Sequence, residues 1–567
     1  MKKILSLLIA IVLSIGCLAM GTSCMKQTDT IDDPKTINVR LYKAGFNDLF
    51  IYELKQKFEE VFASEGYKVN VLTPSSSSAG TPMVQEMSRG YDKTQIDLYI
   101  TGAIMPNHVS KTGLYGEVCE DLEAAVFNKT AINYDGTETT KKISQLISPD
   151  IVPFLRADDG TMYAYCWAQT SAGMVVNTSK LLDYGVTELP RTTNEMFALF
   201  DMITNGANGL GSSKETKTYP VTYNLAEGAG GATSYQNCAI ETWLAQYDID
   251  WYNDFLRLQN KQADGSWKNM TDGWKVFQDK RIAQVLEAGI QFMDSKYAAP
   301  NSTTHDLDQA QGLVMNENNG KDNNVVFMLN GDWFLNEVKA NYRKQLDDIG
   351  FMNVPVISAL GVKLFGAGTS YGLSDVECDE LLSYICKLVD EGKTIDQIIS
   401  LVKDETGVTL AKAEAERVAT ARGICFSRGI EHLCYVTKGT TKMEIISLFL
   451  RMMASEDYAR TFLTKANGST PYAPHVDFGA GETSYEFIKN AKALVANPYF
   501  RAINARIQGL RREVLETDYI MPFKAGASNL ALTLRNTSGD YATSAEKLRA
   551  DCEAHAKEKW EKYFSNN

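Results

Sequence analysis

Apolar and polar residues follow two different periods at the start of the chain. Ile37, Val39 and Leu41 alternate with polar residues, which predicts a β-strand. Apolar residues then recur every fourth position, which predicts an amphipathic helix; they are Phe46, Phe50, Leu54, Phe58 and Phe62. The apolar runs at 69–72 and 96–100 predict two more strands. Because strands alternate with helices, we predict an α/β chain with a parallel sheet.

Residues that directly follow strands of such a sheet are candidates for ligand binding. Ligands of open α/β sheets bind beyond the carboxyl ends of the strands. Tyr42 and Thr101 each follow a predicted strand and are chosen on this topological argument alone. Tyr223 and Asn224 close a strand-like run in a second α/β region and are plausible polar contributors.

Two helical features stand out in the second half of the chain. Residues 376–441 have a mostly helical pattern without ligand-like features, and we interpret them as an insertion. Residues 543–546 match a capping box and predict the start of a C-terminal helix. One face of that helix is predicted to be formed by Leu548, Cys552, Ala556, Trp560 and Tyr563.

The first 24 residues have the layout of a signal peptide for an exported lipoprotein. Lys2 and Lys3 precede an apolar run, and small residues lead to Cys24. Cys24 is the predicted lipidated residue, and Cys17 is an alternative that leaves a shorter signal. A membrane-spanning helix is the other interpretation, and the missing basic cluster after the run disfavours it. We expect residues 25–36 to be a polar tether to a lipid anchor on the outer face of the cytoplasmic membrane, or on the periplasmic side in a Gram-negative cell.

Composition and charge narrow the class of protein. The chain has 567 residues, so more than one lobe is expected. A formal net charge of -13 argues against nucleic acid or anionic lipid as the main partner. No C-x-x-C pair is present among the cysteines after Cys24, which makes a zinc ribbon unlikely to form. The sequence is compatible both with disulfides and with buried free thiols among these residues, which are Cys119, Cys166, Cys238, Cys378, Cys386, Cys425, Cys434 and Cys552.

Several segments, taken in order, resemble the family 1 extracellular solute-binding proteins, the group that includes maltose-binding protein. YAYCWAQT at 163–170 and GMVVN at 173–177 resemble the first crossing between the two lobes of that family. FMLNGDW at 327–333 resembles the strand and turn that present a binding-site tryptophan, and GAGTSYGL at 366–373 resembles the return crossing. The late helix and small-residue loop find a match at 449–471.

The resemblance implies a two-lobed periplasmic-binding-protein fold of type II-like topology, with a solute held between the lobes. The expected first lobe comprises 37–165 and 361–478, with the helical insertion within the latter, and the second comprises 166–360 and 479–567. A carbohydrate passed on to an ABC permease is the implied cargo. The chain is expected to be a lipid-anchored monomer that uses no cofactor or metal and is not an enzyme.

Candidate binding residues combine this resemblance with the chemistry of sugars. Sugars present apolar C–H faces and hydroxyls, so they need aromatic platforms beside hydrogen-bonding groups. The resemblance implies as cleft residues Trp333, Asp332, Trp167, Gln169, Thr170, Ser370 and Tyr371. An aromatic cluster at 243–274 is interpreted mainly as core of the second lobe, with one or two members lining an extended cleft.

Two other classes of function stay open at this stage. Residues 368–372 match G-x-S-x-G, the nucleophile elbow of α/β-hydrolases, which requires a preceding strand and a helix that starts at the serine. We favour an inter-lobe crossing for this segment, and a surface-anchored carbohydrate hydrolase is the alternative. A second alternative is a lipoprotein that binds a glycan or peptide without a transporter.

Overall fold

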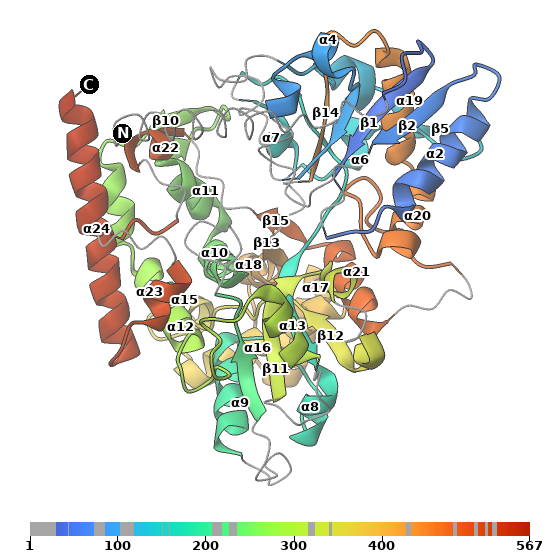
Figure 1. Cartoon of the computed structure of the whole chain (residues 1–567). Coiled ribbons are helices and arrows are strands. Elements are labelled where there is room, and N and C mark those ends of the chain that lie inside the picture. The colour runs from blue at the N-terminus through green and yellow to red at the C-terminus, as the bar shows by residue number, and fades with distance from the viewer. Residues whose placement is uncertain are drawn as a thin grey trace, which may run out of the picture.

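A computed structural model describes most of the chain and shows two α/β lobes; in Figure 1 the first is at the upper right, and the second lies below it and to its left. The described residues are 30–42, 45–72, 85–102, 118–149, 151–157, 159–206, 218–225, 235–315, 324–338, 343–426, 432–479, 485–503, 509–515, 520–523 and 530–566. The predicted signal segment, with Cys17 and Cys24, lies outside them. Among these residues no helix is both long enough and apolar enough to cross a membrane.

The first lobe is built on a five-stranded sheet. Its order is β2 (Lys68–Leu72), β1 (Thr36–Leu41), β3 (Leu98–Ile100), β14 (Leu433–Val436) and β6 (Tyr165–Cys166). Strand β1 pairs in parallel with β2 and β3, whereas β14 is antiparallel to β3 and β6. β1, β2, β3 and β6 therefore end at the same edge of the sheet.

Helices cover this sheet because their apolar faces match it. Phe50, Leu54 and Phe58 of α2 (Leu49–Val61) are fully buried, which confirms the predicted helix and its period. The other elements of the lobe are α4 (Tyr91–Thr94), the π-helix η1 (Glu123–Phe127), the hairpin β4 (Thr130–Ile132) and β5 (Glu138–Lys142), α6 (Ile143–Leu146), α7 (Val152–Leu155), α19 (Met443–Met453) and α20 (Glu456–Ala466).

The second lobe is built on a six-stranded mixed sheet. The order is β15 (Arg501–Ile503), β13 (Ile424–Phe426), β7 (Ala172–Asn177), β11 (Asn324–Gly331) and β8 (Thr218–Thr222), with β12 (Ile349–Met352) also paired to β7. Strands β8 and β11 are parallel, and both run antiparallel to β7. Because β7 starts where the chain leaves the first lobe, β8 and β11 end at the edge that faces that lobe.

Helices surround the second sheet and extend to the C-terminus. They are α8 (Thr178–Asp183), α9 (Thr193–Asn205), α10 (Tyr235–Tyr247), α11 (Ile249–Arg257), η2 (Gly273–Gln278), α12 (Lys280–Phe292), α13 (Leu307–Val314), α14 (Phe334–Glu337), η3 (Arg343–Asp348), α15 (Ala359–Phe365), α16 (Asp375–Asp390), α17 (Ile395–Thr406), α18 (Lys412–Gly423), α21 (Glu486–Ala496), α22 (Gly509–Leu515), α23 (Leu530–Arg535) and α24 (Tyr541–Asn566). A small hairpin, β9 (Gln259–Lys261) and β10 (Trp267–Asn269), follows α11.

Three segments connect the lobes. The first joins β6 to β7 at residues 167–171, as predicted from the sequence. The second joins β13 to β14, and the third runs from α20 to α21. The first and third segments lie side by side, because the backbone nitrogen of Gln169 donates to the carbonyl of Ser469 at 2.8 Å.

The return crossing predicted at 366–373 is wrong. Strand β13 belongs to the second sheet and β14 to the first, so the chain returns after Phe426. Residues 366–373 instead form a tight loop between α15 and α16, closed by Leu373, whose backbone nitrogen donates to the carbonyl of Phe365 at 3.0 Å. Gly368 and Gly372 have positive φ angles there, so the glycines serve a turn and not a crossing.

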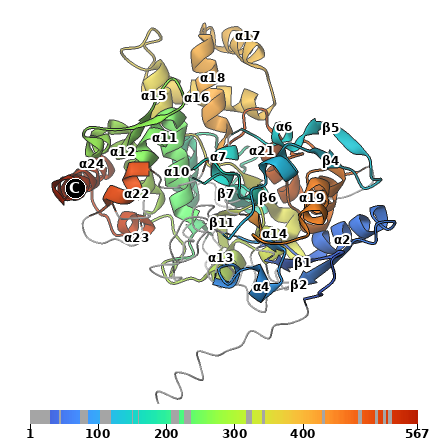
Figure 2. The same ribbon diagram turned by 90° about the horizontal axis from the view of Figure 1, so that it is seen from above.

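The lobe boundaries and the insertion shift accordingly. Helices α16, α17 and α18 pack on one another and confirm the predicted helical character, and Figure 2 shows them at the top of the view. They belong to the second lobe, since Asp379 accepts a hydrogen bond from Thr192 at 2.9 Å and Ser383 donates to Glu195 at 2.5 Å. The helical segment ends at Gly423, because β13 and β14 are core strands of the two sheets.

Two smaller expectations are also settled. The eight cysteines of the described residues are buried free thiols, which decides between the two options left open by the sequence. Helix α24 begins at Tyr541, two residues before the predicted capping box, and Asp540 accepts from the backbone nitrogen of Thr543 at 2.9 Å. A local sequence pattern located this helix but not its first residue.

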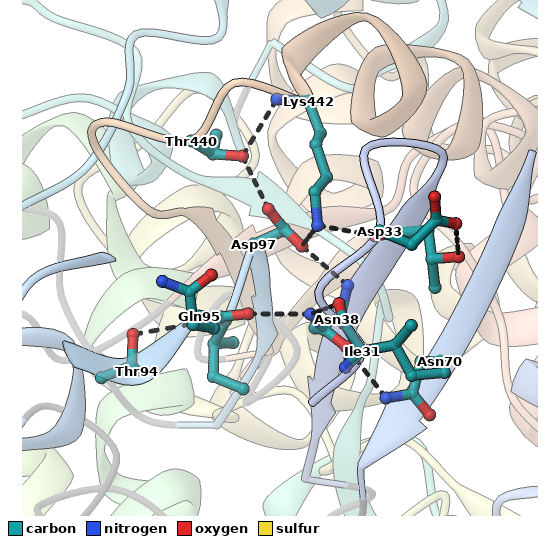
Figure 3. Close-up of polar contacts among 11 residues, drawn as sticks. Ile31, Asp33, Asn38, Asn70, Thr94, Gln95, Asp97, Thr440 and Lys442 are labelled. Atoms are coloured by element: carbon teal, nitrogen blue, oxygen red, sulfur yellow. Dashed lines mark hydrogen bonds and ion pairs between the residues drawn. The ribbon is translucent and has the colours of Figure 1, made fainter. Parts of the chain in front are cut away.

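A buried ion pair lies at the end of the first sheet away from the second lobe (Figure 3). Asp97 is fully buried, and its Oδ2 accepts from the ammonium of Lys442 at 3.2 Å and from the backbone of Asn38 at 2.8 Å. Its Oδ1 accepts from the hydroxyl of Thr440 at 2.7 Å, and Lys442 also donates to the carbonyl of Thr36 at 2.7 Å. The carboxylate is thus satisfied on both oxygens, which ties α19 and β14 to the start of β1.

Asn38 holds the chain that enters the lobe. Its Oδ1 accepts from the backbone nitrogen of Ile31 at 3.0 Å, and its Nδ2 donates back to the Ile31 carbonyl at 3.1 Å. Nδ2 also donates to Gln95, while Oδ1 accepts from Asn70 at 2.9 Å (Figure 3). The segment before β1 is therefore fixed at the edge of the sheet opposite the inter-lobe edge.

We predict that Lys442→Met lowers the free energy of unfolding by about 3–5 kcal/mol, because the Asp97 carboxylate loses its buried counter-ion. Urea denaturation of the full chain measures this change. Lys412→Met is the matched control, since Lys412 pairs with Glu416 at the surface with side chains 68% and 54% exposed. Its effect is expected to stay within about 0.5 kcal/mol. Equal losses in the two variants would contradict the assignment.

Candidate functional site

The inter-lobe edge receives the ends of strands from both sheets. Tyr42 and Thr101 follow β1 and β3 of the first sheet. Tyr223 follows β8, and Asp332 and Trp333 follow β11 of the second sheet. Strands of both sheets therefore end at one interface from opposite sides, and the residues that follow them differ in whether their side chains reach it.

Trp167 belongs to the packed core of the first crossing. It is fully buried, and its ring stacks on Phe50 with centroids 5.6 Å apart. Its indole Nε1 donates to the carbonyl of Thr101 at 2.9 Å, and its backbone nitrogen donates to that of His432 at 3.0 Å. Thr101 is itself buried and donates its hydroxyl to the carbonyl of Leu433 at 3.0 Å. Both predicted contact residues are thus engaged in holding the crossings together.

Asp332 joins the end of β11 to the first crossing. Its Oδ2 accepts from the backbone nitrogen of Ser171 at 2.9 Å and from the Ser171 hydroxyl at 3.2 Å. In return its backbone nitrogen donates to the carbonyl of Ser171 at 2.9 Å. Its second oxygen, Oδ1, is buried and has no hydrogen-bond partner among the described residues. Burial raises the pKa of Asp332 to about 7, against the lowering effect of the Ser171 hydrogen bonds.

Trp333 lies where the two lobes touch. It is only 6% exposed, and a Cβ atom placed on Gly45 of the first lobe would lie 2.7 Å from its Cδ1. On the side of its own lobe it packs against Gly331, and its ring lies 6.1 Å from that of Tyr235 at the start of α10. The indole therefore fills the space between Gly45 and Gly331. Its ring fits there because neither glycine has a side chain.

Helix α14, which starts after Trp333, also contacts the first lobe. The amide of Asn336 donates to the carbonyl of Ala466 at the end of α20, at 2.8 Å. The amide of Asn467 donates to the side-chain oxygen of Asn336 at 3.0 Å. Tyr42 approaches the same helix from the first lobe, and burial together with the charge of Glu337 raises the pKa of its hydroxyl.

The remaining predicted residues divide between the interface and other places. Gln169 and Thr170 are buried in the first crossing. Tyr223 is buried and donates its hydroxyl to the carbonyl of Phe292 at 2.7 Å, so it packs inside the second lobe, with Asn224 buried next to it. Ser370 and Tyr371 are not at the interface.

The loop that holds Ser370 and Tyr371 belongs to the helical part of the second lobe. The hydroxyl of Tyr371 accepts from the backbone nitrogen of Ala411, and its ring packs edge-on against Phe365. Assigning these two residues to the cleft was wrong, because it depended on the misplaced return crossing.

Three polar residues near the interface were missed by the sequence analysis. Gln236, in the first turn of α10, is 2% exposed, and neither its Nε2 nor its Oε1 has a partner in the part of the chain that the structure describes. Within the described ranges, the buried Nδ2 of Asn330 at the end of β11 and the hydroxyl of Thr470 in the third connection also have no hydrogen-bond partner. A polar residue that ends an apolar strand was a usable signal for Asn330, whereas the other two depend on tertiary packing.

These unpartnered atoms favour an uncharged, hydroxyl-rich ligand. A buried polar atom without a hydrogen bond costs about 1–3 kcal/mol, so a ligand that pairs it gains that energy. Amide groups of Gln236 and Asn330 supply donors and an acceptor, and Asp332 supplies an acceptor when ionised. Trp333 and Tyr235 add aromatic surface beside them. No group of three or more metal-ligating side chains occurs in the described part of the chain.

Comparison with known proteins identifies the fold. No family model and no curated protein matches the sequence. Among solved structures, a probable secreted solute-binding lipoprotein from Streptomyces coelicolor is similar over 93% of this chain and 99% of its own, with 13% identity and a TM-score of 0.52. The solute-binding protein RafE in complex with raffinose is similar over 92% and 99%, with 11% identity and a TM-score of 0.50.

A third similar structure is the cyclic alpha-maltosyl-1,6-maltose binding protein from Arthrobacter globiformis. The similarity covers 93% of this chain and 100% of that one, with 10% identity and a TM-score of 0.50. Identities this low establish a shared fold and nothing finer. The two-lobed solute-binding-protein fold predicted from the sequence is thereby confirmed.

We predict that Asp332→Asn stabilises the protein at pH 8 more than at pH 5. The folded carboxyl keeps its proton up to about pH 7, whereas the unfolded one loses it near its ordinary value of 3.8. As the pH rises from 3.8 to about 7, the free energy of unfolding of the unmodified protein therefore decreases by up to about 1.4 kcal/mol per pH unit. The variant lacks the carboxyl group, so its free energy of unfolding does not decrease for this reason. Melting temperatures across this range measure the difference.

Glu416→Gln on α18 removes the same charge at an exposed position and serves as the control for net charge. The difference in melting temperature between Glu416→Gln and the unmodified protein is expected to change little with pH. An Asp332→Asn difference that stays constant from pH 5 to pH 8 would show that the buried carboxyl carries no such cost.

Proposed function

We propose that this chain is the substrate-binding component of an ABC importer and that it captures a carbohydrate between its lobes without converting it. The observation that carries the proposal is the convergence of unpartnered, buried polar atoms and aromatic rings where the two sheets meet. Asp332, Gln236 and Thr470 provide the polar atoms, and Trp333 and Tyr235 provide the rings. This combination suits the hydroxyls and the C–H faces of a sugar.

The similar structures support the same ligand class. RafE is described in complex with raffinose, and the Arthrobacter globiformis protein is named for a cyclic maltosyl-maltose. Both ligands are oligosaccharides, and both proteins share this fold at similar coverage. A mono- or oligosaccharide is therefore the proposed solute, which a permease in the membrane would receive from the monomeric protein.

The hydrolase alternative loses its main support. Residues 368–372, which match G-x-S-x-G, lie between helices α15 and α16, whereas a nucleophile elbow joins a strand to a helix that begins at the serine.

A thermal-shift screen against mono- and oligosaccharides tests the proposal directly, because a ligand that binds only the folded state raises the melting temperature. New reducing ends after incubation with a stabilising glycan would support hydrolysis instead.

The proposed mechanism uses separation and closure of the lobes. Solute enters when the first lobe moves away from Trp333, and closure then buries the solute among the polar atoms of both lobes. Asp332 stays hydrogen-bonded to Ser171 of the first crossing, so it can present Oδ1 to the solute from a fixed position. Closure would bring the first lobe against the ligand and signal its presence to the permease.

We predict that Trp333→Ala weakens binding of the stabilising sugar roughly 5- to 150-fold, or about 1–3 kcal/mol, because the aromatic platform is lost. Isothermal titration calorimetry on the folded variant measures this effect. Trp560→Ala is the matched control, since Trp560 is also 6% exposed and also packs against a glycine, Gly273. We expect Trp560→Ala to lower the stability of the protein but not its affinity for the sugar. Unchanged affinity in the Trp333 variant would reject its role.

We also propose that the chain is exported and lipidated at Cys24. The support is the sequence layout alone, in which a basic start, an apolar run and small residues precede the cysteine. Two or three acyl chains would hold the protein at the membrane surface and keep it close to a permease.

We predict that Cys24→Ser releases the protein from the membrane fraction and abolishes labelling by a palmitate analogue, because the serine cannot form the thioether. Cys17→Ser is the control and is expected to leave both unchanged. Loss of the label in the Cys17 variant instead would move the lipidation site to that residue.

A further inference from the structure

A separate cavity lies in the second lobe between α11 and the β9–β10 hairpin. Its volume is about 340 Å³, at the lower end of the roughly 300–1,000 Å³ usual for ligand pockets. A single sugar ring fits in a volume of that size. The side chains that line it are Asp250, Asn253, Asp254, Lys261, Gln262 and Trp267.

The walls of this cavity are held in place by interactions behind them. The guanidinium of Arg257 lies over the ring of Trp267, 4.2 Å from its centroid, and so fixes the indole while occupying one of its faces. The backbone nitrogen of Lys261 donates to Oδ1 of Asp254 at 3.4 Å, which joins the hairpin to α11. At the hairpin turn, Asp264 accepts from Ser266 at 2.9 Å.

Asp254 and Gln262 form hydrogen bonds within the fold, whereas three other polar side chains of this cavity do not. The side chains of Asp250, Asn253 and Lys261 form no hydrogen bond or ion pair with other described residues. Partial burial raises the pKa of Asp254, an effect strengthened by the nearby charge of Asp250. Carboxylates, an amide and an ammonium group around one indole ring offer both donors and acceptors of hydrogen bonds.

We propose that this cavity is a second saccharide-binding site, which takes a single pyranose ring on the open face of Trp267. The hydroxyls of the sugar donate to Asp250 and Asp254, while Asn253 and Lys261 donate to its oxygen atoms. The choice of a sugar as ligand rests on the proposed function, but the site is distinct from the inter-lobe one. Nearly balanced charge around the indole favours a neutral ligand over an ion.

The experiment uses the full chain labelled with 5-fluorotryptophan, which gives one fluorine signal for each of its seven tryptophans. The signal of Trp267 is identified by its loss in Trp267→Phe. Methyl α-glucoside, methyl β-galactoside and N-acetylglucosamine are titrated in turn. We expect the Trp267 signal to shift and saturate with at least one of them, with a dissociation constant in the millimolar range, as for other small, shallow sites.

Two variants separate this site from its surroundings. Asp254→Asn is expected to weaken the Trp267 response about tenfold, since a charged hydrogen-bond acceptor is lost. Trp251→Phe is the matched control. Trp251 lies on α11, as Asp254 does, but its ring stacks on that of Phe255 and lies under the guanidinium of Arg281. The Trp267 response is therefore expected to persist in this variant.

The inter-lobe site is tested independently in a Trp333→Ala background. A Trp267 response that persists there supports a second site, even if the inter-lobe site binds no sugar at all. A Trp267 response that disappears with Trp333 shows only a distant effect of the main site and overturns the proposal. A Trp267 signal that no sugar moves also overturns it, while calorimetric binding that depends on Trp333 would leave the proposed function intact.

Discussion

The short first connection between the lobes constrains every other feature of the inter-lobe site. Strand β6 ends at Cys166 and β7 begins at Ala172, so the two sheets lie at most about 21 Å apart along this path. Strands β1, β3 and β6 end at the edge where the chain crosses, and β8 and β11 end at the facing edge. Polar residues that follow the strands are therefore brought together by the topology, before any side chain contributes.

The interface contains buried polar atoms at an energetic cost, and this cost is one support for the proposed binding site there. Asp332 keeps an oxygen buried without a partner, whereas Asp97 in the first lobe has both oxygens satisfied. Both carboxyl groups are buried to a similar degree, so the difference lies in their partners and not in their depth. A satisfied carboxylate fixes the fold, while an unsatisfied one next to an inter-lobe aromatic ring has a bond left for a ligand.

How much of this structure the sequence could predict depends on how local each signal is. The helix α2 and the ends of strands β1 and β11 are encoded by patterns of a few neighbouring residues, and the structure has these elements where the patterns predict them. The burial of Trp167 could not be predicted, because it depends on Phe50 and His432 from distant segments. The Gly-rich motif at 366–373 led to a wrong prediction of the return crossing, because glycines occur both in tight turns and in segments that cross between lobes.

If Trp333 is the platform for the solute, as proposed, its position would couple solute capture to movement of the lobes. Gly45 of the first lobe lies against its indole, so the proposed platform is covered when the lobes touch as they do here. A sugar can reach the ring only if Gly45 withdraws, and once bound it must replace the contact that Gly45 made. The lobe contact and the solute therefore compete for the same aromatic surface. The hydrogen bonds between Asn336, Ala466 and Asn467 add to the lobe contact, so entry of a solute requires that these bonds also open or that the lobes rotate about them.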